Sequence, residues 1–526
     1  MLEPQRHARS FAPMPSPPLV SVSTPNYAAS FHEFGRQDQE EDDTMLARYH
    51  GRIEIRGPLR FWGLQQARPE ALQPVRQFFD GWSETHCGQK PPYILAFVNS
   101  MSGNLRVSQA IKKQLNTLLD HKFTPSGRGE VYLAGSVCEL SEVSNNERLR
   151  ERRIWRFGGR TATLRRCGRH VRDVIRDTKR LMAVANITQL RFLVCGGDGT
   201  VTWVLHEIEA CKDENRDLFK LREEEPAIGV VPAGTGNDLA RSLGWGPKLR
   251  SVAALVGYVQ WSLAADIVPL DQWQVTITFD QAALMAQNVS DLRGPPAFRE
   301  KTNGSPTQHG KRVFEGYFQN YFSIGMDASV THGVERARRS CLGKLCFLFG
   351  LGKVCYAAQA YRTGGFSCCA APLSVQGDTL QYRSSASSAA STPWSELEVG
   401  GVRQLTLMNI NSYGSGRVVL SREELSQTSP SDHLLELVTL SNACRFGCVM
   451  AGGTAEVLKR PAALKLTLER PEAVQMDGES WVLPAGCQLE VRWHRTVRML
   501  RPPTCPMGSW SGRQVPGFWH PKEPPF

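Results

Sequence analysis

Three stretches of the chain repeat the order strand, glycine loop, helix, and this repetition restricts the fold more than any other feature. YILAFV (93–98), RFLVC (191–195) and AIGVV (227–231) are short apolar runs of the strand type, and a glycine-containing loop follows each. Parallel strands joined by helices must form one sheet with the helices on its faces. We therefore expect a doubly wound α/β domain.

The segments after the loops have helical spacing. Apolar residues recur every three or four positions from Leu105 to Leu119, and again from Val201 to Ile208. After the third loop, Asn237 or Asp238 is a natural helix N-cap. Beyond about residue 270 the pattern changes to short alternating runs such as VTITF and LKLTLE, which favours a second, β-rich domain.

Composition limits the class of protein. The 526 residues carry a net charge of +11, which favours an anionic partner: a nucleic acid, an anionic membrane surface or a phosphorylated ligand. No secretion signal or run of eighteen apolar residues is present, so we expect a cytoplasmic protein whose fourteen cysteines are reduced thiols. The Pro-, Ser- and charge-rich residues 1–50 predict a disordered arm, and 51–90 an extension of unknown role.

The glycine loops should leave the sheet at the edge where parallel sheets bind ligands. Loops without side chains let backbone amides approach phosphates, yet Asp198 in GGDG would repel a phosphate unless a cation or a reacting hydroxyl lay beside it. A Mg-nucleotide with an alcohol acceptor satisfies both conditions, which indicates phosphoryl transfer. A plain tight turn at GGDG and simple helix capping at Asn237 and Asp238 are the alternatives.

Six motifs resemble the diacylglycerol kinases of eukaryotes. They are GGDGTVTWVL (196–205), VVPAGTGNDLARSLGWG (230–246), PLDQW (269–273), QNYFSIGMDASV (319–330), LMNINSYGSG (407–416) and VQMDGESW (474–481). The resemblance implies a catalytic, ATP-binding domain at 91–268, a β-sandwich-like accessory domain at 269–500 and a tail at 501–526. The active site would lie in the cleft between the two domains.

The resemblance also implies the reaction: transfer of phosphate from ATP, with Mg²⁺, to the primary hydroxyl of 1,2-diacylglycerol in a membrane, giving phosphatidic acid as a lipid signal. It assigns catalysis to Asp198, Asp477 and Glu479, with Asp477 as the expected general base and Asp198 as the alternative, and it assigns an Mg²⁺–water network to the metal residues Asp238 and Asp271. The implied nucleotide-binding residues are Asn99, Ser102, Gly103, Gly196, Gly197, Gly199, Thr200, Gly234, Thr235, Gly236 and Asn237.

Some features depart from the family pattern. Gln272 and His433 stand where arginine and glycine are more usual, and no C1, EF-hand or ankyrin-like module is present, which suggests a compact form. The arginine-rich segment Arg148–Arg180 is a candidate contact for an anionic membrane. A kinase for ceramide, a sphingoid base or NAD and an inactive lipid-binding scaffold remain alternatives. Nucleic-acid binding is not expected, and the oligomeric state is not indicated.

Overall fold

The structure is a computed structural model, and all its described residues belong to one compact unit, Trp62–Phe526. The described residues are 91–99, 105–120, 122–123, 132–140, 171–184, 189–219, 224–234, 236–280, 299–300, 311–339, 375, 379–384 and 393–503. The expected arm (1–50), the extension (51–90) and all but the first three residues of the tail therefore lie outside them.

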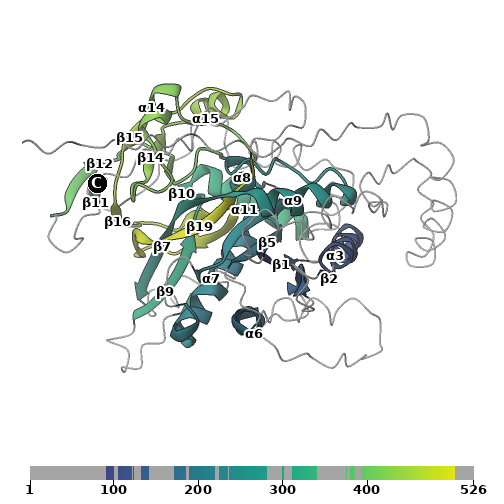
Figure 1. The fold of residues 1–526 in the computed structure, drawn as a ribbon. Helices are drawn as coiled ribbons and strands as arrows, with labels where there is room; N and C mark the ends of the chain where they lie inside the picture. The colour runs from purple at the N-terminus through teal and green to yellow at the C-terminus, as the bar shows by residue number, and fades with distance from the viewer. Residues whose placement is uncertain are drawn as a thin grey trace, which may run out of the picture. The chain divides into compact units, whose positions relative to one another are not determined.

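The first part of the chain forms the predicted parallel sheet. Its main elements are β1 (Tyr93–Val98), α3 (Leu105–Leu119), β4 (Gly135–Glu139), α6 (Val171–Val184), β5 (Leu190–Gly196), α7 (Asp198–Glu214), β6 (Ala227–Pro232), α8 (Asp238–Ser242) and α9 (Leu255–Ala264). Strands β4, β1, β5 and β6 lie in this order and are all parallel. Helix α3 packs on α9 and α6 packs on α7, and Figure 1 shows the two pairs on opposite sides of the strands.

Short elements connect these. A separate two-stranded sheet pairs β2 (Lys122–Phe123) with β3 (Tyr132–Leu133), and single 3₁₀ turns occupy Arg216–Leu218 and Val252–Ala254.

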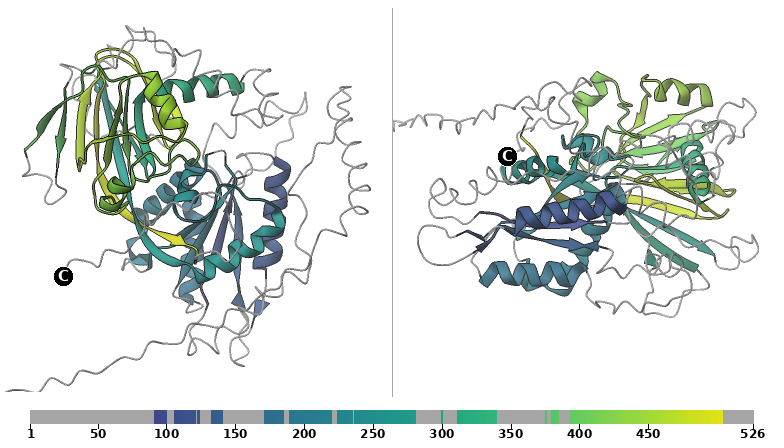
Figure 2. Two further views of the ribbon diagram at one scale, coloured as in Figure 1. Left: turned by 90° about the horizontal axis from the view of Figure 1, so that it is seen from above. Right: turned by 90° about the vertical axis from the view of Figure 1, so that its right-hand side faces the viewer.

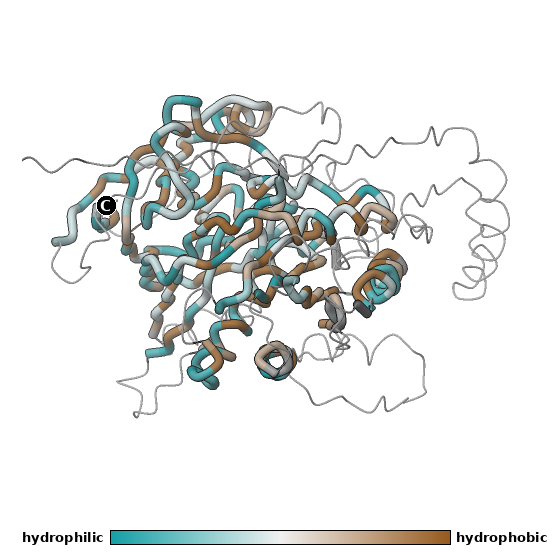
Figure 3. The backbone as a smooth tube through the Cα atoms, in the orientation of Figure 1, coloured by the Kyte–Doolittle hydropathy of each residue, from teal (hydrophilic) through white to brown (hydrophobic). Residues whose placement is uncertain are grey.

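The helical periodicity read from the sequence is confirmed. In α7 the predicted inner residues Val201, Val204, Leu205 and Ile208 are all at most 3% exposed. Figure 3 shows the matching alternation of hydrophobic and hydrophilic residues along α3 and α7. The spacing places one apolar stripe of each helix against the sheet, which is the main driving force for its formation.

The second part is β-rich, as predicted, and consists of two facing sheets. Its elements are β7 (Asp266–Asp280), β8 (Arg299–Glu300), β9 (Lys311–Phe318), β10 (Tyr321–Gly325), α11 (Met326–Arg339), β11 (Thr379–Arg383), β12 (Ser395–Glu398), β13 (Gln404–Met408), α14 (Arg422–Gln427), β14 (Glu436–Leu440), α15 (Ala443–Met450), β15 (Val457–Lys459), β16 (Ala463–Thr467), β17 (Glu472–Met476), β18 (Glu479–Leu483) and β19 (Gln488–Arg501). One sheet, in the order β15-β14-β13-β10-β17-β18, is entirely antiparallel.

The other facing sheet continues the parallel sheet. β16, β19, β7 and β9 pair side by side, and Trp273 and Phe318 from this sheet share a buried core with Phe322 and Leu407 from the antiparallel one. The predicted sandwich is therefore present, with its core between the two sheets.

Strand β19 belongs to both parts of the fold. It pairs along its length with β7, and near its end Met499 pairs in parallel with Ile228 of β6. Figure 2 shows this strand, in yellow, running from the sandwich into the parallel strands. The predicted boundary at 268/269 falls inside β7, so this strand runs from one expected domain into the other. β19 also belongs to both, because it forms hydrogen bonds with β6 and with β7.

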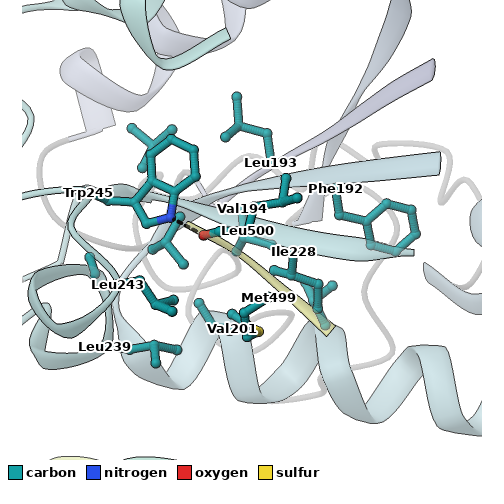
Figure 4. Packing of buried hydrophobic residues seen from close by; sticks show 14 of the residues in the cluster. Phe192, Leu193, Val194, Val201, Ile228, Leu239, Leu243, Trp245, Met499 and Leu500 are labelled. Atoms are coloured by element: carbon teal, nitrogen blue, oxygen red, sulfur yellow. Dashed lines mark hydrogen bonds between the residues drawn. The ribbon is translucent and has the colours of Figure 1, made fainter. Parts of the chain in front are cut away.

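Trp245 fixes the contact between β19 and the parallel part. Its side chain is 1% exposed, and its Nε1–H donates to the Leu500 carbonyl at 2.8 Å (Figure 4). The ring stacks on Tyr258 and covers Gly229, where an added Cβ would come within 2.9 Å of the indole. A glycine in β6 therefore makes room for the tryptophan.

The helices and the arginine ion pairs of the described residues bear on membrane contact. None of its helices is both long and apolar enough to cross a membrane. Of Arg148–Arg180 only 171–180 is described, and there Arg172 forms ion pairs with Glu207 and Glu214, and Arg176 with Asp173 and Asp177.

We expect Trp245→Phe to lower the free energy of unfolding by about 2 kcal/mol, because it removes a buried hydrogen bond and leaves a cavity. Urea denaturation measures this loss. The control is Trp261→Phe, a half-buried tryptophan on α9, which should cost clearly less. Equal losses in the two variants would contradict the role given to Trp245.

Candidate active site

The second and third glycine loops lie directly against each other. A Cβ built on Gly234 would come within 2.4 Å of the Gly197 Cα, and one built on Gly196 would come within 2.5 Å of Thr200 Oγ1. None of these glycines has a positive φ. Gly197 and Gly234 are glycines because the two backbones approach closely, and Gly196 leaves room for the Thr200 side chain, so a tight turn does not explain them.

Asp198 is the first residue of α7, and its carboxylate binds the start of α8. Oδ2 accepts the Asp238 N–H at 3.0 Å and Oδ1 accepts the Leu239 N–H at 3.1 Å. Within the described part of the chain this carboxylate accepts these two hydrogen bonds, whereas a carboxylate can accept about four. Asp198 thus supplies the acceptor for the N–H groups at the start of α8, and its carboxylate can still accept further hydrogen bonds.

The capping prediction for Asn237 was wrong in its chemistry. Asn237 does stand at the N-cap position of α8, but in the left-handed conformation (φ 56°) and without a side-chain capping bond. Its side chain instead accepts from Gly234 N–H and donates to the carbonyls of Gly234 and Pro247. Asn237 closes the third glycine loop, and the capping acceptor comes from Asp198.

Asp477 lies at the turn between β17 and β18 and accepts four hydrogen bonds. Its Oδ1 binds the N–H groups of Asn320 (2.9 Å) and Tyr321 (3.1 Å). Its Oδ2 binds the Gln319 N–H (3.2 Å) and the Thr202 hydroxyl (3.3 Å). The single Thr202 proton also faces the Asp198 carbonyl at 3.2 Å, so Asp477 accepts from three backbone N–H groups and shares the hydroxyl proton of Thr202, which ties it to α7.

Asp238 also accepts four hydrogen bonds. The Ser412 hydroxyl (2.6 Å) and Gly416 N–H (2.8 Å) donate to Oδ1, and the Ser415 N–H (3.1 Å) and Tyr321 hydroxyl (3.4 Å) donate to Oδ2. All four donors come from the β-rich part of the chain. Asp238 therefore attaches α8 to that part.

The three carboxylates influence each other electrostatically. Burial, followed by the negative charges of Asp238 and Asp477, raises the pKa of Asp198 to about 7. Burial also raises the pKa of Asp477 to about 7, although hydrogen bonds from the Gln319, Tyr321 and Asn320 amides oppose the shift. Two buried carboxyls with a pKa near neutrality are unusual outside functional sites.

Asp271 lies in a different set of contacts from these three. Its side chain is fully buried and accepts from Thr496 Oγ1 (2.7 Å), Trp493 Nε1 (3.1 Å) and the His433 N–H (2.7 Å). Burial raises its pKa, against the hydrogen bonds of Thr496 and His433. His433 has φ 61°, which explains why a glycine would suit this position.

The remaining predicted site residues that the structure describes lie beside the glycine loops. Asn99 donates to Thr200 Oγ1 at 3.0 Å. A Cβ on Gly199 would come within 2.8 Å of Glu479 Oε1, and one on Gly236 would lie 3.7 Å from Asp198 Oδ2. Ser102, Gly103 and Thr235 lie outside the described residues.

Sequence reasoning missed the residues that hold the carboxylates. Tyr321, Ser412, Ser415, Gly416 and Thr202 were all inside recognised motifs, but none was assigned a role. Most of these residues donate through a backbone N–H group or through a hydroxyl in a loop. Neither kind of donor produces a periodic pattern in the sequence. The only signal was the concentration of small polar residues in NSYGSG.

The two carboxylates predicted to bind the metal do not fit direct coordination. Asp238 already accepts four hydrogen bonds and Asp271 three, and they share no donor. No group of three or more His, Cys, Asp and Glu side chains arranged for a metal ion occurs in the described part of the chain. Asp198, which retains acceptor positions, is the carboxylate of the cluster best suited to a ligand.

Two family models match the chain. The diacylglycerol kinase catalytic domain matches residues 163–268, and the diacylglycerol kinase accessory domain matches residues 317–480. The first match contains the second and third glycine loops with Asp198 and Asp238, and the second contains Tyr321, the 412–416 loop and Asp477.

Similar proteins agree with these matches. Diacylglycerol kinase 4 of Arabidopsis thaliana is 28% identical over 74% of this chain and 77% of its own length, and diacylglycerol kinase 7 is 29% identical over 74% and 76%. Diacylglycerol kinase theta of Homo sapiens is 26% identical over 59% of this chain and 29% of its own length. The chain matches both domain models of the family in order, and its structure contains the predicted parallel sheet and sandwich. The chain therefore belongs to the diacylglycerol kinase family.

Proposed function

We propose that the protein transfers the γ-phosphoryl group of ATP to the primary hydroxyl of 1,2-diacylglycerol and produces phosphatidic acid. The observation that carries the proposal is the buried cluster of Asp198, Asp238 and Asp477 beside two packed glycine loops, in a chain with both domains of the family. A catalytic domain of this family implies the use of ATP, and its lipid acceptor implies contact with a membrane.

Asp198 is the better candidate for the general base. A base must accept the proton of the attacking hydroxyl, so it needs an open acceptor position and a pKa near the working pH. Both Asp198 and Asp477 have a pKa of about 7, but Asp477 accepts from three backbone N–H groups and shares the Thr202 hydroxyl proton, whereas Asp198 accepts from two N–H groups. In this mechanism Asp477 orients β10 and α7, and Asp198 removes the proton.

The glycine loops suit the phosphates of ATP. The proposed contacts are Asn99, Ser102, Gly103, Gly196, Gly197, Gly199, Thr200, Gly234, Thr235, Gly236 and Asn237. The amides of Asp238 and Leu239 are unsuitable for this purpose because Asp198 already accepts from them. Glu479, beside the first turn of α7, completes the set of acidic residues facing the loops.

Mg²⁺ is proposed to enter with ATP. The phosphates and water molecules would supply most of its ligands, as is usual for this ion. Asp238 and Asp271 keep structural roles, because their carboxylates are occupied by hydrogen bonds.

Membrane contact is proposed as peripheral. The net charge of +11 favours an anionic surface. Within 171–180, Arg172 and Arg176 are paired with acids of the protein and Arg180 is exposed, so contact through Arg148–Arg180 would use Arg180 or residues before 171.

We expect Asp198→Asn to lower kcat at least about 10²-fold, because the hydroxyl loses its proton acceptor. The measurement is transfer of labelled phosphate from Mg-ATP to diacylglycerol, ceramide, sphingosine and NAD in mixed micelles. Asp213→Asn, an exposed acid on the same helix, is the matched control and should keep full activity. Label mainly in ceramide or sphingosine would refute diacylglycerol as the substrate, and ATP binding without any transfer would favour an inactive scaffold.

We expect the pH dependence of kcat/KM to follow the ionisation of the Asp198 carboxyl group. Its folded-state pKa is raised to about 7, and only the ionised form can accept a proton, so activity is lost as pH falls through 7 and is retained above it. We expect kcat/KM to fall about tenfold per pH unit below about pH 6.5. A pH–rate profile from pH 5 to 9 tests this, and activity that persists to about pH 4.5 would argue against a base with a raised pKa.

A further inference from the structure

Tyr321 contacts two of the three clustered carboxylates. It lies in β10 and is 5% exposed. Its backbone N–H donates to Asp477 Oδ1 at 3.1 Å, and its hydroxyl donates to Asp238 Oδ2 at 3.4 Å. Burial raises the pKa of Tyr321 well above its ordinary range, so the hydroxyl keeps its proton and remains a donor. One residue thus spans the distance between an acid of the β-rich part and an acid of α8.

A second tyrosine fixes the ring of Tyr321. The rings of Tyr321 and Tyr413 pack with centroids 5.0 Å apart, and the Tyr413 hydroxyl donates to the buried Asp327. Asp327 also accepts from Ser323 Oγ and from Gln475 Nε2, both at 2.6 Å. A side chain packed against a buried hydrogen-bond network has little freedom to move, which suits it for positioning another group.

The hydroxyl of Tyr321 acts on Asp198 through α8. It holds the Asp238 carboxylate, while the Asp238 N–H donates to Asp198 Oδ2. We propose that Tyr321 is a positioning residue for the phosphoryl transfer: it holds the start of α8, and with it Asp198, at a fixed separation from Asp477. This inference rests on the proposed function, in which Asp198 is the base.

The Tyr321→Phe variant removes only the hydroxyl and keeps the ring against Tyr413. Asp238 retains its three other donors, so the fold should persist. We expect kcat for diacylglycerol phosphorylation to fall at least about tenfold, while the KM for ATP changes by less than about twofold. Amide hydrogen exchange should become faster across Asp238–Ser242 and remain unchanged in β10.

Two further variants separate positioning from general stability. Tyr258→Phe removes another buried tyrosine hydroxyl, which donates to the Trp245 carbonyl at 3.1 Å, and should keep the wild-type kcat and the wild-type exchange in α8. Ser412→Ala removes a donor to the other oxygen of Asp238 and should lower kcat and loosen α8 as Tyr321→Phe does.

Wild-type kcat together with wild-type exchange in α8 for Tyr321→Phe would overturn the proposal. So would an equal fall of kcat in Tyr258→Phe, because the effect would then be one of stability alone. If the wild-type protein phosphorylates no diacylglycerol, the proposed function fails, and the exchange in α8 still decides whether Tyr321 holds that helix.

Discussion

The hydrogen bonds from the start of α8 to the Asp198 carboxylate are the interaction on which the site depends. They join the second strand-loop-helix unit to the third, and they bury a carboxylate where water would otherwise stabilise its charge. The free-energy cost of that burial appears as the pKa of about 7. The two hydrogen bonds fix the geometry of two glycine loops but oppose the rise in pKa. Burial and the charges of Asp238 and Asp477 raise the pKa of Asp198 and give it the basicity that removal of a hydroxyl proton requires.

The β-rich part of the chain completes this arrangement. Strand β19 pairs with both β7 and β6, so the two parts share one sheet, and Trp245 holds its end in place. Across the same junction, Asp238 accepts from Tyr321 and the 412–416 loop, and Thr202 donates to Asp477. Asp238 is thus positioned by donors from the β-rich part, and Thr202 ties Asp477 to the parallel part, so the cluster of acids depends on contacts between both parts of the fold.

The sequence predicted the elements well and the contacts between them less well. β1 and α3 begin and end where the sequence predicted, because a strand buried on both faces is a continuous apolar run and a helix buried on one face has a periodic pattern. Asp198, Asp238 and Asp477 come from three of the recognised motifs, and the structure brings their carboxylates close enough to influence one another electrostatically. The capping role of Asn237 was wrong because Asp198, forty positions away from Asp238, supplies the acceptor. No local pattern could reveal that Asp477 and Asp238 are saturated with donors, since backbone amides carry no sequence signature.

The position of the acceptor hydroxyl tests the central claim most directly. A crystal structure with a non-hydrolysable ATP analogue and a short-chain diacylglycerol would place that hydroxyl beside one of the two candidate bases. We expect its oxygen within about 3.2 Å of the Asp198 carboxylate, while Asp477 keeps its four donors. A hydroxyl bound to Asp477, with the bonds of Asn320 or Tyr321 to that carboxylate broken, would contradict the account.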